Sequence, residues 1–311
     1  MTCPLEIKIG NLTFRNNVFG ASGCFGHAYE LANYTDLSRI GAITPKTSTF
    51  EPRTGNLPPR IWEVPCATLT SIGLQGPGID GDLAMHLPKI KEVLRPDQFF
   101  YSLAAYTIED YLAAANKLAA LVRPGEIAAL EVNCACPNVK LGGGSFSKVP
   151  HELEKLISVL VKELPFPIIG KINTNSDNYC DAAKACEAGG AIAIYTSNTP
   201  IGMAIDIKKR RPALGNIKGP INGHANLPVG IAKTWDIYNA VKISIIGSGG
   251  ITCTDDALQY IMAGATAVGI GSATFVEPNT AVLVIDGLEA YCRENGIMNI
   301  SELIGCAHHF K

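Results

Sequence analysis

The sequence predicts an α/β protein: a single (β/α)8 TIM barrel with inserted loops and hairpins over its C-terminal face. Short β-branched apolar runs alternate eight times with amphipathic helical patterns, an order typical of parallel sheets. The chain of 311 residues has the length that eight such units need. No linker or change of composition divides it, so we expect residues 1–311 to form one domain. A doubly wound sheet is the alternative, because periodicity does not reveal closure.

The expected elements follow one another in a regular order. Strands are predicted at 17–21, 41–45, 98–103, 128–133, 167–171, 191–196, 243–247 and 266–270. Helices are predicted at 27–34, 79–93, 107–122, 151–163, 177–188, 229–241, 254–263 and 279–295. Segments 47–78 and 198–228 are rich in Gly, Pro and Asn and exceed ordinary βα loops. Both follow strands, so we expect both to lie over the C-terminal face.

Composition excludes several classes of function. The net charge is -2 and like charges form no run, which disfavours a nucleic-acid surface or a basic membrane-binding patch. No apolar run is long enough to span a bilayer, and the N-terminal sequence does not resemble a secretory leader. The ten cysteines are scattered rather than spaced as a disulfide framework. We therefore expect a cytoplasmic protein with reduced thiols.

Donors gather at the predicted strand ends, where the active site of this fold lies. Lys46 and Lys171 each end an apolar run, and Asn133 and Asn198 end two others. Singly, such a lysine is commonly a solvated cap. Together, these donors suit a ligand with several carbonyls, such as a flavin ring or a pyrimidine. A lysine at the pyrimidine edge of a flavin would also stabilise the negative charge of the reduced ring.

Two glycine-rich segments, "GSGGI" at 247–251 and "GIGSATF" at 269–275, follow the last two strands. Either could merely form a tight turn. Their occurrence after strands seven and eight favours a phosphate site, because glycines let backbone N–H groups approach a phosphate there. Neither matches the Rossmann dinucleotide pattern.

Cys136 follows the fourth strand and has three candidate roles. It could be inert filler, a metal ligand with Cys134, or a base or nucleophile. No neighbouring Cys or His cluster completes a metal site, and none is expected. A position at the barrel mouth near two lysines favours the base, while strand alternation turns Cys134 away. The glycines of "KLGGGSF" (140–146) suit a mobile lid or an ordinary exposed turn.

In these segments the chain resembles class 1 dihydroorotate dehydrogenases. The motifs are "ASGCFG" (21–26), "PKTSTFEPRTGNLPPR" (45–60), "SIGLQGPG" (71–78), "EVNCACPNVKLGGG" (131–144), "GKINTN" (170–175), "SNTPIGMAID" (197–206), "GSGGI" and "GIGSATF". The resemblance covers nearly the whole chain. It implies FMN at the top of the barrel and oxidation of dihydroorotate to orotate in pyrimidine biosynthesis.

The resemblance also assigns roles to residues. Cys136 matches the base that removes the C5 proton while the C6 hydride passes to FMN. The substrate-holding positions match Lys46, Thr70, Ile72, Gly73, Leu74, Asn133, Asn138, Asn198 and Thr199. The FMN-binding positions match Ala21, Ser22, Lys46, Thr47, Asn133, Lys171, Gly223, Gly249, Gly250, Gly271 and Ser272.

Within class 1, "PNVKLGGGSF" (137–146) is most similar to the NAD-linked 1B type. That likeness implies a homodimer of catalytic chains and a partner subunit that carries FAD and an iron–sulfur cluster. The chain has no four-cysteine cluster motif of its own, so a partner would have to supply the cluster. The physiological electron acceptor stays open.

Three positions depart from the family pattern. Thr70 replaces an asparagine, Ala135 replaces the serine before the base, and Thr174 replaces a proline. The first change shortens a substrate-facing donor. It therefore leaves open an FMN-dependent paralogue acting on another cyclic amide such as dihydrouracil. A separate alternative is a flavin-binding partner subunit without activity.

Overall fold

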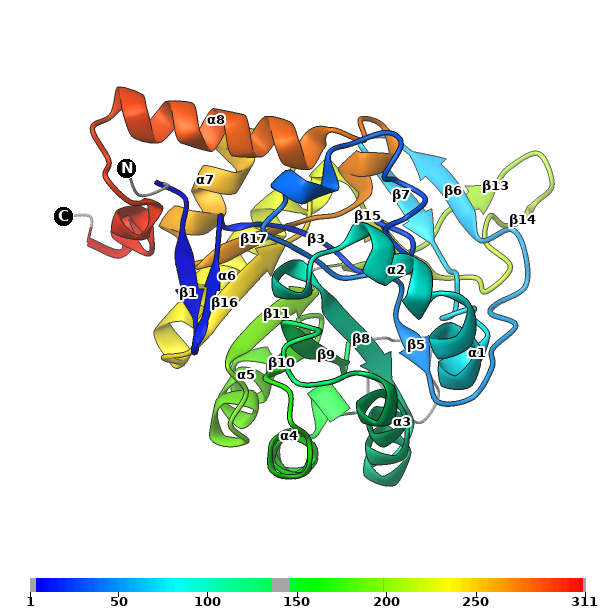
Figure 1. Ribbon diagram of the computed structural model, residues 1–311. Helices are drawn as coiled ribbons and strands as arrows, with labels where there is room; N and C mark the ends of the chain where they lie inside the picture. The colour runs from blue at the N-terminus through cyan, green and yellow to red at the C-terminus, as the bar shows by residue number, and fades with distance from the viewer. Residues whose placement is uncertain (1–3, 136–145, 198, 310–311) are drawn as a thin grey trace.

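The computed structural model describes residues 4–135, 146–197 and 199–309 (Figure 1). Its central sheet contains nine parallel strands in the order β4-β3-β17-β16-β11-β10-β9-β8-β5. All eight predicted strands are confirmed; the second, predicted at 41–45, appears as β4, and β5 lies beyond its predicted bounds. The bounds are β3 (Val18–Gly20), β4 (Ala42–Ile43), β5 (Ser48–Thr49), β8 (Phe100–Ala104), β9 (Ala129–Asn133), β10 (Ile168–Asn173), β11 (Ala193–Ser197), β16 (Ser244–Ser248) and β17 (Ala267–Ile270).

The sheet closes on itself through β4 and β5. These two strands stand at opposite ends of the pairing order, yet only residues 44–47 separate them in the chain. β4 pairs with β3, β5 pairs with β8, and a parallel bridge joins Ile43 to Phe99. The segment 42–49 therefore contacts both neighbours as one interrupted barrel strand. The architecture is a (β/α)8 barrel and not an open doubly wound sheet.

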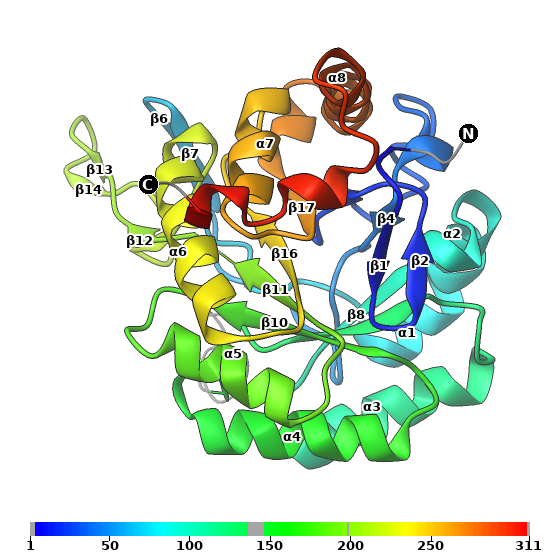
Figure 2. The ribbon, with the colours of Figure 1, turned by 90° about the vertical axis from the view of Figure 1, so that its left-hand side faces the viewer.

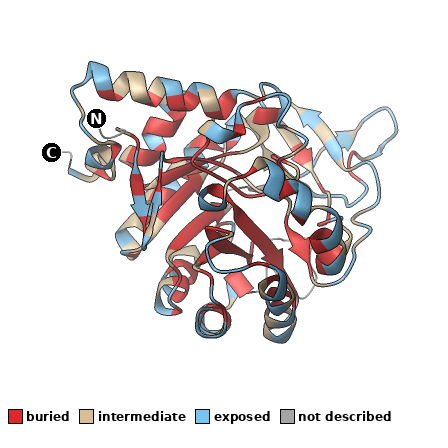
Figure 3. Ribbon diagram, viewed as in Figure 1, coloured by how far each residue is buried: buried red, intermediate tan, exposed pale blue. Residues whose placement is uncertain are grey.

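Helices surround the strands (Figure 2). α4 illustrates why: Leu153, Leu156, Ile157 and Leu160 recur at helical spacing and are all buried. The apolar core is continuous from Leu5 to Ile300, and Figure 3 shows the barrel strands as its buried centre. The helices are α1 (Gly78–Met85), α2 (Leu87–Val93), α3 (Ile108–Leu121), α4 (Pro150–Glu163), α5 (Tyr179–Ala188), α6 (Leu227–Ala240), α7 (Thr254–Met262) and α8 (Thr280–Glu294).

Short 3₁₀ turns connect several of these elements. They are η1 (Leu37–Arg39), η2 (Pro96–Gln98), η3 (Phe146–Lys148), η4 (His224–Asn226), η5 (Ser272–Phe275), η6 (Ile300–Leu303) and η7 (Cys306–His309). Among the described helices, none has both the length and the apolar character that crossing a membrane requires.

The helix predicted at 27–34 is wrong. This segment forms successive tight turns, in which the Leu31 N–H donates to the Ala28 carbonyl oxygen. Ala28 has φ +70°, outside the right-handed helical region. The Glu30 carboxylate also accepts a bond from the His27 N–H and contacts its ring. Local side-chain bonding therefore replaces the helical pattern.

The helix predicted at 79–93 is divided into α1 and α2 at His86. Pro88 explains the break, because proline lacks an N–H to donate to the preceding turn and its ring crowds that turn. His86 consequently lies at a bend and not in a helix interior.

The two long insertions meet in one antiparallel sheet with the order β12-β15-β7-β6. β6 (Ile61–Val64) and β7 (Ala67–Thr70) come from 47–78, while β12 (Ile201–Gly202) and β15 (Gly219–Asn222) come from 198–228. A further hairpin joins β13 (Ile205–Asp206) to β14 (Arg211–Pro212). Figure 1 shows this sheet beside the barrel. Because the insertions follow barrel strands, their sheet belongs to the C-terminal face, as predicted.

An N-terminal hairpin that the sequence analysis did not foresee lies at the other end. It consists of β1 (Ile7–Ile9) and β2 (Leu12–Phe14). A Cβ built on Gly10, at its turn, would lie 3.0 Å from Ile192, just before β11 begins. The hairpin therefore contacts the barrel at the N-terminal ends of its strands.

Candidate active site

Five polar side chains from neighbouring strands form one connected network at the barrel mouth. The Ser22 and Thr47 hydroxyl oxygens are 2.9 Å apart, and Thr47 Oγ1 is also 2.9 Å from Ser102 Oγ. Ser102 Oγ donates to Glu131 Oε1 over 2.7 Å. Lys171 Nζ lies 3.3 Å from the same oxygen. The structure thus links three predicted flavin-binding residues through two that the sequence analysis did not select.

Asn133 is held in this network from both ends of its amide. Its Nδ2 donates to Thr47 Oγ1 over 3.1 Å, and its Oδ1 accepts from the Ala135 N–H over 3.2 Å. The Tyr111 hydroxyl donates to its main-chain oxygen. The side chain is buried, so its orientation is fixed by the protein.

The next residue, Cys134, lies in the hydrophobic core, as the alternation of the strand predicted. Its carbonyl oxygen accepts a hydrogen bond from Ser147 Oγ. Burial raises the pKa of the Cys134 thiol well above its ordinary value. Cys134 therefore has the properties of a structural cysteine.

Glu131 and Lys171 form a buried ion pair behind the strand ends. The Glu131 side chain is 0% exposed and that of Lys171 is 12% exposed. The Lys171 ammonium lies 5.2 Å from the centre of the Tyr195 ring, a distance that allows a cation–π contact. Glu131 Oε2 is buried and has no hydrogen-bond partner among the described residues. The carboxylate therefore holds the Lys171 side chain in place in a nearly buried setting.

Cys24 lies beside both lysines. Burial raises the pKa of its thiol to about 11, although the charges of Lys171 and Lys46 act in the opposite direction. Lys46 is half-buried, and its main-chain N–H donates to the Gly26 carbonyl oxygen over 2.6 Å. A Cβ built on Gly271 would meet only Cys24 Sγ, at 3.7 Å. Neutral, poorly reactive sulfur thus borders the open space above Gly271.

The two glycine-rich segments end neighbouring strands, because β16 pairs with β17. Gly249 and Gly250 have φ values of +114° and +79°, and Gly223 has φ +110°. A Cβ built on Gly250 would lie only 2.5 Å from the Leu227 nitrogen. The Tyr260 hydroxyl lies within 2.9 Å of the carbonyl oxygens of both Ser248 and Gly249. These contacts fix the loop in a form that only glycine adopts without strain.

At the end of the next strand, Ser272 opens η5 and follows Gly271 directly. Ala21 is placed by its N–H, which donates to the Ile270 carbonyl oxygen over 2.9 Å. The predicted flavin positions after β3, β16 and β17 therefore lie on adjacent strands of the barrel.

The first insertion holds the predicted substrate segment 70–74. The Asn56 N–H donates to the Ile72 carbonyl oxygen over 3.0 Å, and Arg53 Nε donates to that of Gly73 over 3.1 Å. Gly73 and Leu74 have φ values of +79° and +54°. These bonds fix the loop in a conformation that the sequence analysis did not foresee.

Thr70 pairs with a residue of the second insertion. Asn222 Nδ2 donates to its Oγ1 over 2.8 Å. An amide from β15 therefore lies beside the position at which the family pattern has an asparagine. No sequence signal pointed to Asn222, because the contact spans two insertions.

The other predicted positions have more varied outcomes. The Thr199 carbonyl oxygen accepts from Asn175 Nδ2 over 2.8 Å. Thr174 Oγ1 donates to the Ser197 carbonyl oxygen over 3.3 Å, which joins the ends of β10 and β11. Cys136, Asn138 and Asn198 lie outside the described residues, as does most of the predicted lid. Their roles stay predictions.

Comparisons with known proteins place this chain in a family. Residues 4–292 match the family model described as dihydroorotate dehydrogenase. The chain is 42% identical over 301 residues to the "Dihydroorotate dehydrogenase B (NAD(+)), catalytic subunit" of Geotalea uraniireducens (strain Rf4), covering 97% of each protein. It is also 42% identical over 309 residues to the protein of that name from Desulforamulus reducens (strain ATCC BAA-1160 / DSM 100696 / MI-1), covering 99% of this chain and 100% of the relative.

A solved structure supports the fold. The Eimeria tenella dihydroorotate dehydrogenase in complex with ferulenol superposes with a TM-score of 0.79 at 22% sequence identity. The match covers 99% of this chain and 89% of the other. The chain belongs to the dihydroorotate dehydrogenase family of flavin-dependent oxidoreductases.

Proposed function

We propose that this protein oxidises dihydroorotate to orotate in pyrimidine biosynthesis, with FMN as its flavin. The observation that carries the proposal is the network from Ser22 to Lys171, which gathers fixed donors and one cation at the barrel mouth. Relatives that are 42% identical over nearly the whole chain are named for this reaction.

Residues at the mouth fit FMN in two respects. Gly271 and Gly23 leave space, since a Cβ at Gly271 meets only one sulfur and a Cβ at Gly23 meets nothing within 4 Å. Such open glycines at a strand end leave room for a phosphate. The lysine and amide donors suit the carbonyl oxygens of the ring. The proposed binding residues are Ala21, Ser22, Lys46, Thr47, Asn133, Lys171, Gly223, Gly249, Gly250, Gly271 and Ser272.

FMN, when bound, supplies the hydride acceptor. The protein supplies the rest of the chemistry. Lys171, fixed by Glu131, presents a positive charge that stabilises an electron-rich ring. Asn133 is a rigid donor for a substrate carbonyl, and Lys46 is a cation suited to a substrate carboxylate. We assign substrate binding to Lys46, Thr70, Ile72, Gly73, Leu74, Asn133, Asn138, Asn198 and Thr199.

We assign the base to Cys136, which would take the C5 proton of the substrate. The experiment is anaerobic mixing of the flavin-loaded protein with dihydroorotate, which should bleach the flavin absorbance. Dihydrouracil, which lacks the carboxylate, should not bleach it.

Replacing Cys136 by Ala should slow bleaching by about 10²–10⁴-fold, which is the usual contribution of a base. Orotate binding should change little. The matched control is Cys66→Ala, at an exposed cysteine. An unchanged rate in Cys136→Ala would remove it from the mechanism.

We further propose a homodimer that binds a partner subunit carrying FAD and an iron–sulfur cluster. The word "catalytic subunit" in the names of the relatives supports a partner for them. A cytoplasmic location is supported by the free state of all eight described cysteines. Co-purification of an FAD-containing iron–sulfur protein tests the partner, and light scattering of the isolated chain tests the dimer.

A further inference from the structure

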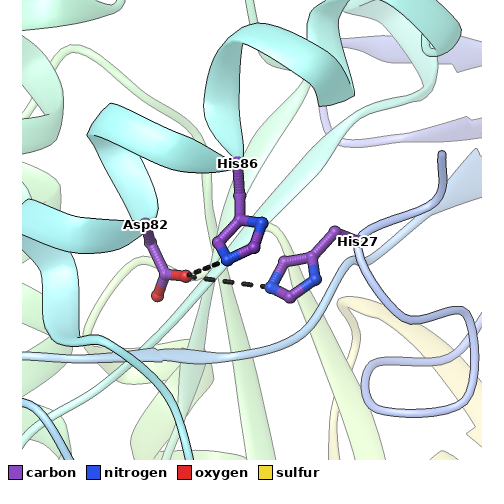
Figure 4. Close-up of side chains that lie close together, drawn as sticks. All are labelled: His27, Asp82 and His86. Atoms are coloured by element: carbon purple, nitrogen blue, oxygen red, sulfur yellow. Dashed lines mark ion pairs between the residues drawn. The ribbon is translucent and has the colours of Figure 1, made fainter. Parts of the chain in front are cut away.

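Three side chains with metal-binding atoms converge beside the barrel, at a site the proposed reaction does not use (Figure 4). They are His27, from the turns after β3, and Asp82 and His86, from α1 and the bend that follows it. Asp82 and His86 are four residues apart, so both project from the same side of α1. Their donor atoms and that of His27 all lie within 4.8 Å of one another.

Both imidazoles direct the same nitrogen toward one carboxylate oxygen. His27 Nε2 lies 3.8 Å from Asp82 Oδ1, and His86 Nε2 lies 3.9 Å from it. These separations exceed ordinary hydrogen bonds. Around a tetrahedral metal with bonds of about 2.0–2.1 Å, neighbouring ligand atoms lie roughly 3.3 Å apart. Each nitrogen–oxygen distance would therefore shorten by about half an ångström on metal binding.

The opposite nitrogen of each ring already has a partner. His27 Nδ1 lies 3.1 Å from Glu30 Oε1, and His86 Nδ1 lies 2.8 Å from the Tyr29 hydroxyl. Histidines that bind metals commonly donate their second N–H to a carboxylate or another acceptor, which leaves a lone pair on the coordinating nitrogen. Glu30 and Tyr29 are in position for this role.

We propose that His27, Asp82 and His86 bind one divalent first-row transition metal, such as Zn²⁺. Two imidazoles and a carboxylate suit this class of metal, whereas Ca²⁺ and Mg²⁺ prefer oxygen ligands alone. The rings are stacked with centroids 3.7 Å apart and planes at 5°, so one ring turns when both bind. The bordering cavity of about 10 Å³ is close to the smallest that holds a water, the natural fourth ligand.

The ion would connect two segments that are distant in the sequence, the turns after β3 and the junction of α1 and α2. Lys46 and Ser102 line the same cavity, so the ion would lie behind the wall of the active site. Asp82, with a side chain 8% exposed, would then have a cation beside it.

The test is direct metal binding to the full chain without substrate. Protein stripped with a chelator is titrated with Zn²⁺ by calorimetry and with Co²⁺ by visible absorption. We expect one saturable site per chain, absent in His27→Ala/His86→Ala and kept in His151→Ala, at an exposed histidine. Equal binding by the double variant and the wild type, or no saturable site in the wild type, would overturn the proposal. Circular dichroism confirms that each variant is folded.

Second variants test the orienting groups without removing a ligand. Tyr29→Phe and Glu30→Gln should each weaken Zn²⁺ binding by roughly 10–100-fold, the usual effect of such outer partners. Unchanged affinity in both would overturn the orienting role of Tyr29 and Glu30. Because the readout is metal affinity, the result is independent of whether the protein oxidises dihydroorotate.

Discussion

Lys171 is nearly buried and is held by Glu131, so the position of its side chain depends on one carboxylate. Glu131 Oε1 also accepts from Ser102, which connects the ion pair to Thr47 and Ser22. Removing one partner of a buried pair costs more than the pair itself contributes, because the remaining charge stays desolvated. The carboxylate is therefore a positioning group whose loss is measurable before any flavin binds.

Glu131→Gln should destabilise the flavin-free protein by about 3 kcal/mol, the lower end for a broken buried pair, because Lys171 keeps slight exposure. The measurement is the free energy of unfolding in urea. The control is Glu163→Gln, which removes the partner of Lys162 at the surface and should cost less than about 1 kcal/mol. Equal effects of the two substitutions on the free energy of unfolding would show that Glu131 does not stabilise a buried ion pair.

Cys24 should resist alkylation although it borders the site. Since burial raises the pKa of its thiol to about 11, roughly one molecule in a thousand carries the thiolate at pH 8. Iodoacetamide should modify it on the order of 100-fold more slowly than an ordinary thiol, and the rate should rise with pH up to about 11. Peptide mass spectrometry measures the rate, with exposed Cys66 as the reference. Rapid modification at pH 8 would contradict the raised pKa.

At this scale the sequence predicted residues that end strands, and missed those whose role depends on a neighbour. Asn133 and Lys171 were selected because strand ends converge in this fold, and Thr47 was selected through the family resemblance. The structure places all three in one network. Glu131 did carry a signal, a charge inside an apolar strand. Asn222 carried none, because its contact with Thr70 forms only when two distant insertions pair.

At the scale of elements, hydrophobic periodicity predicted the strands and helices that bury apolar side chains in the core. It failed where local backbone geometry determines the conformation. The eight strands and most helices follow from apolar spacing. The segment 27–34 also has helix-compatible residues, but left-handed backbone at Ala28 and the contacts of Glu30 with His27 give turns instead. The same two departures from helix, at 27–34 and at His86, bring the proposed metal ligands together.

The glycine loop after β16 depends on a backbone form that a side chain opposes. Gly250→Ala should destabilise the protein by more than about 1–2 kcal/mol, the cost of left-handed backbone alone, because its Cβ would also meet the Leu227 nitrogen at 2.5 Å. Flavin content after purification should fall as well. Gly76→Ala is the control, since a Cβ there meets nothing within 4 Å. Wild-type stability and flavin content in Gly250→Ala would contradict this role of the loop.

At the scale of the whole molecule, the insertions and the barrel are built from interleaved parts of the chain. β7 and β15 pair although the barrel strands β8 to β11 lie between them in sequence. The sequence predicted that both insertions cover one face, because both follow strands. Their pairing with each other was not predictable, since short strands in Gly- and Pro-rich segments carry no pattern that identifies a partner.

The continuous core predicts that residues 1–311 unfold as one unit. Apolar contacts run from Leu5 in the N-terminal segment to Ile300 near the C-terminus, so neither half can lose its packing without exposing the other. Calorimetry of the monodisperse protein should give one transition whose calorimetric and van't Hoff enthalpies agree. FMN at about 100 times its dissociation constant should raise the stability by about 2.7 kcal/mol and shift the whole transition upward. Two transitions, of which only one responds to FMN, would contradict the single domain and would confine the flavin site to one part of the chain.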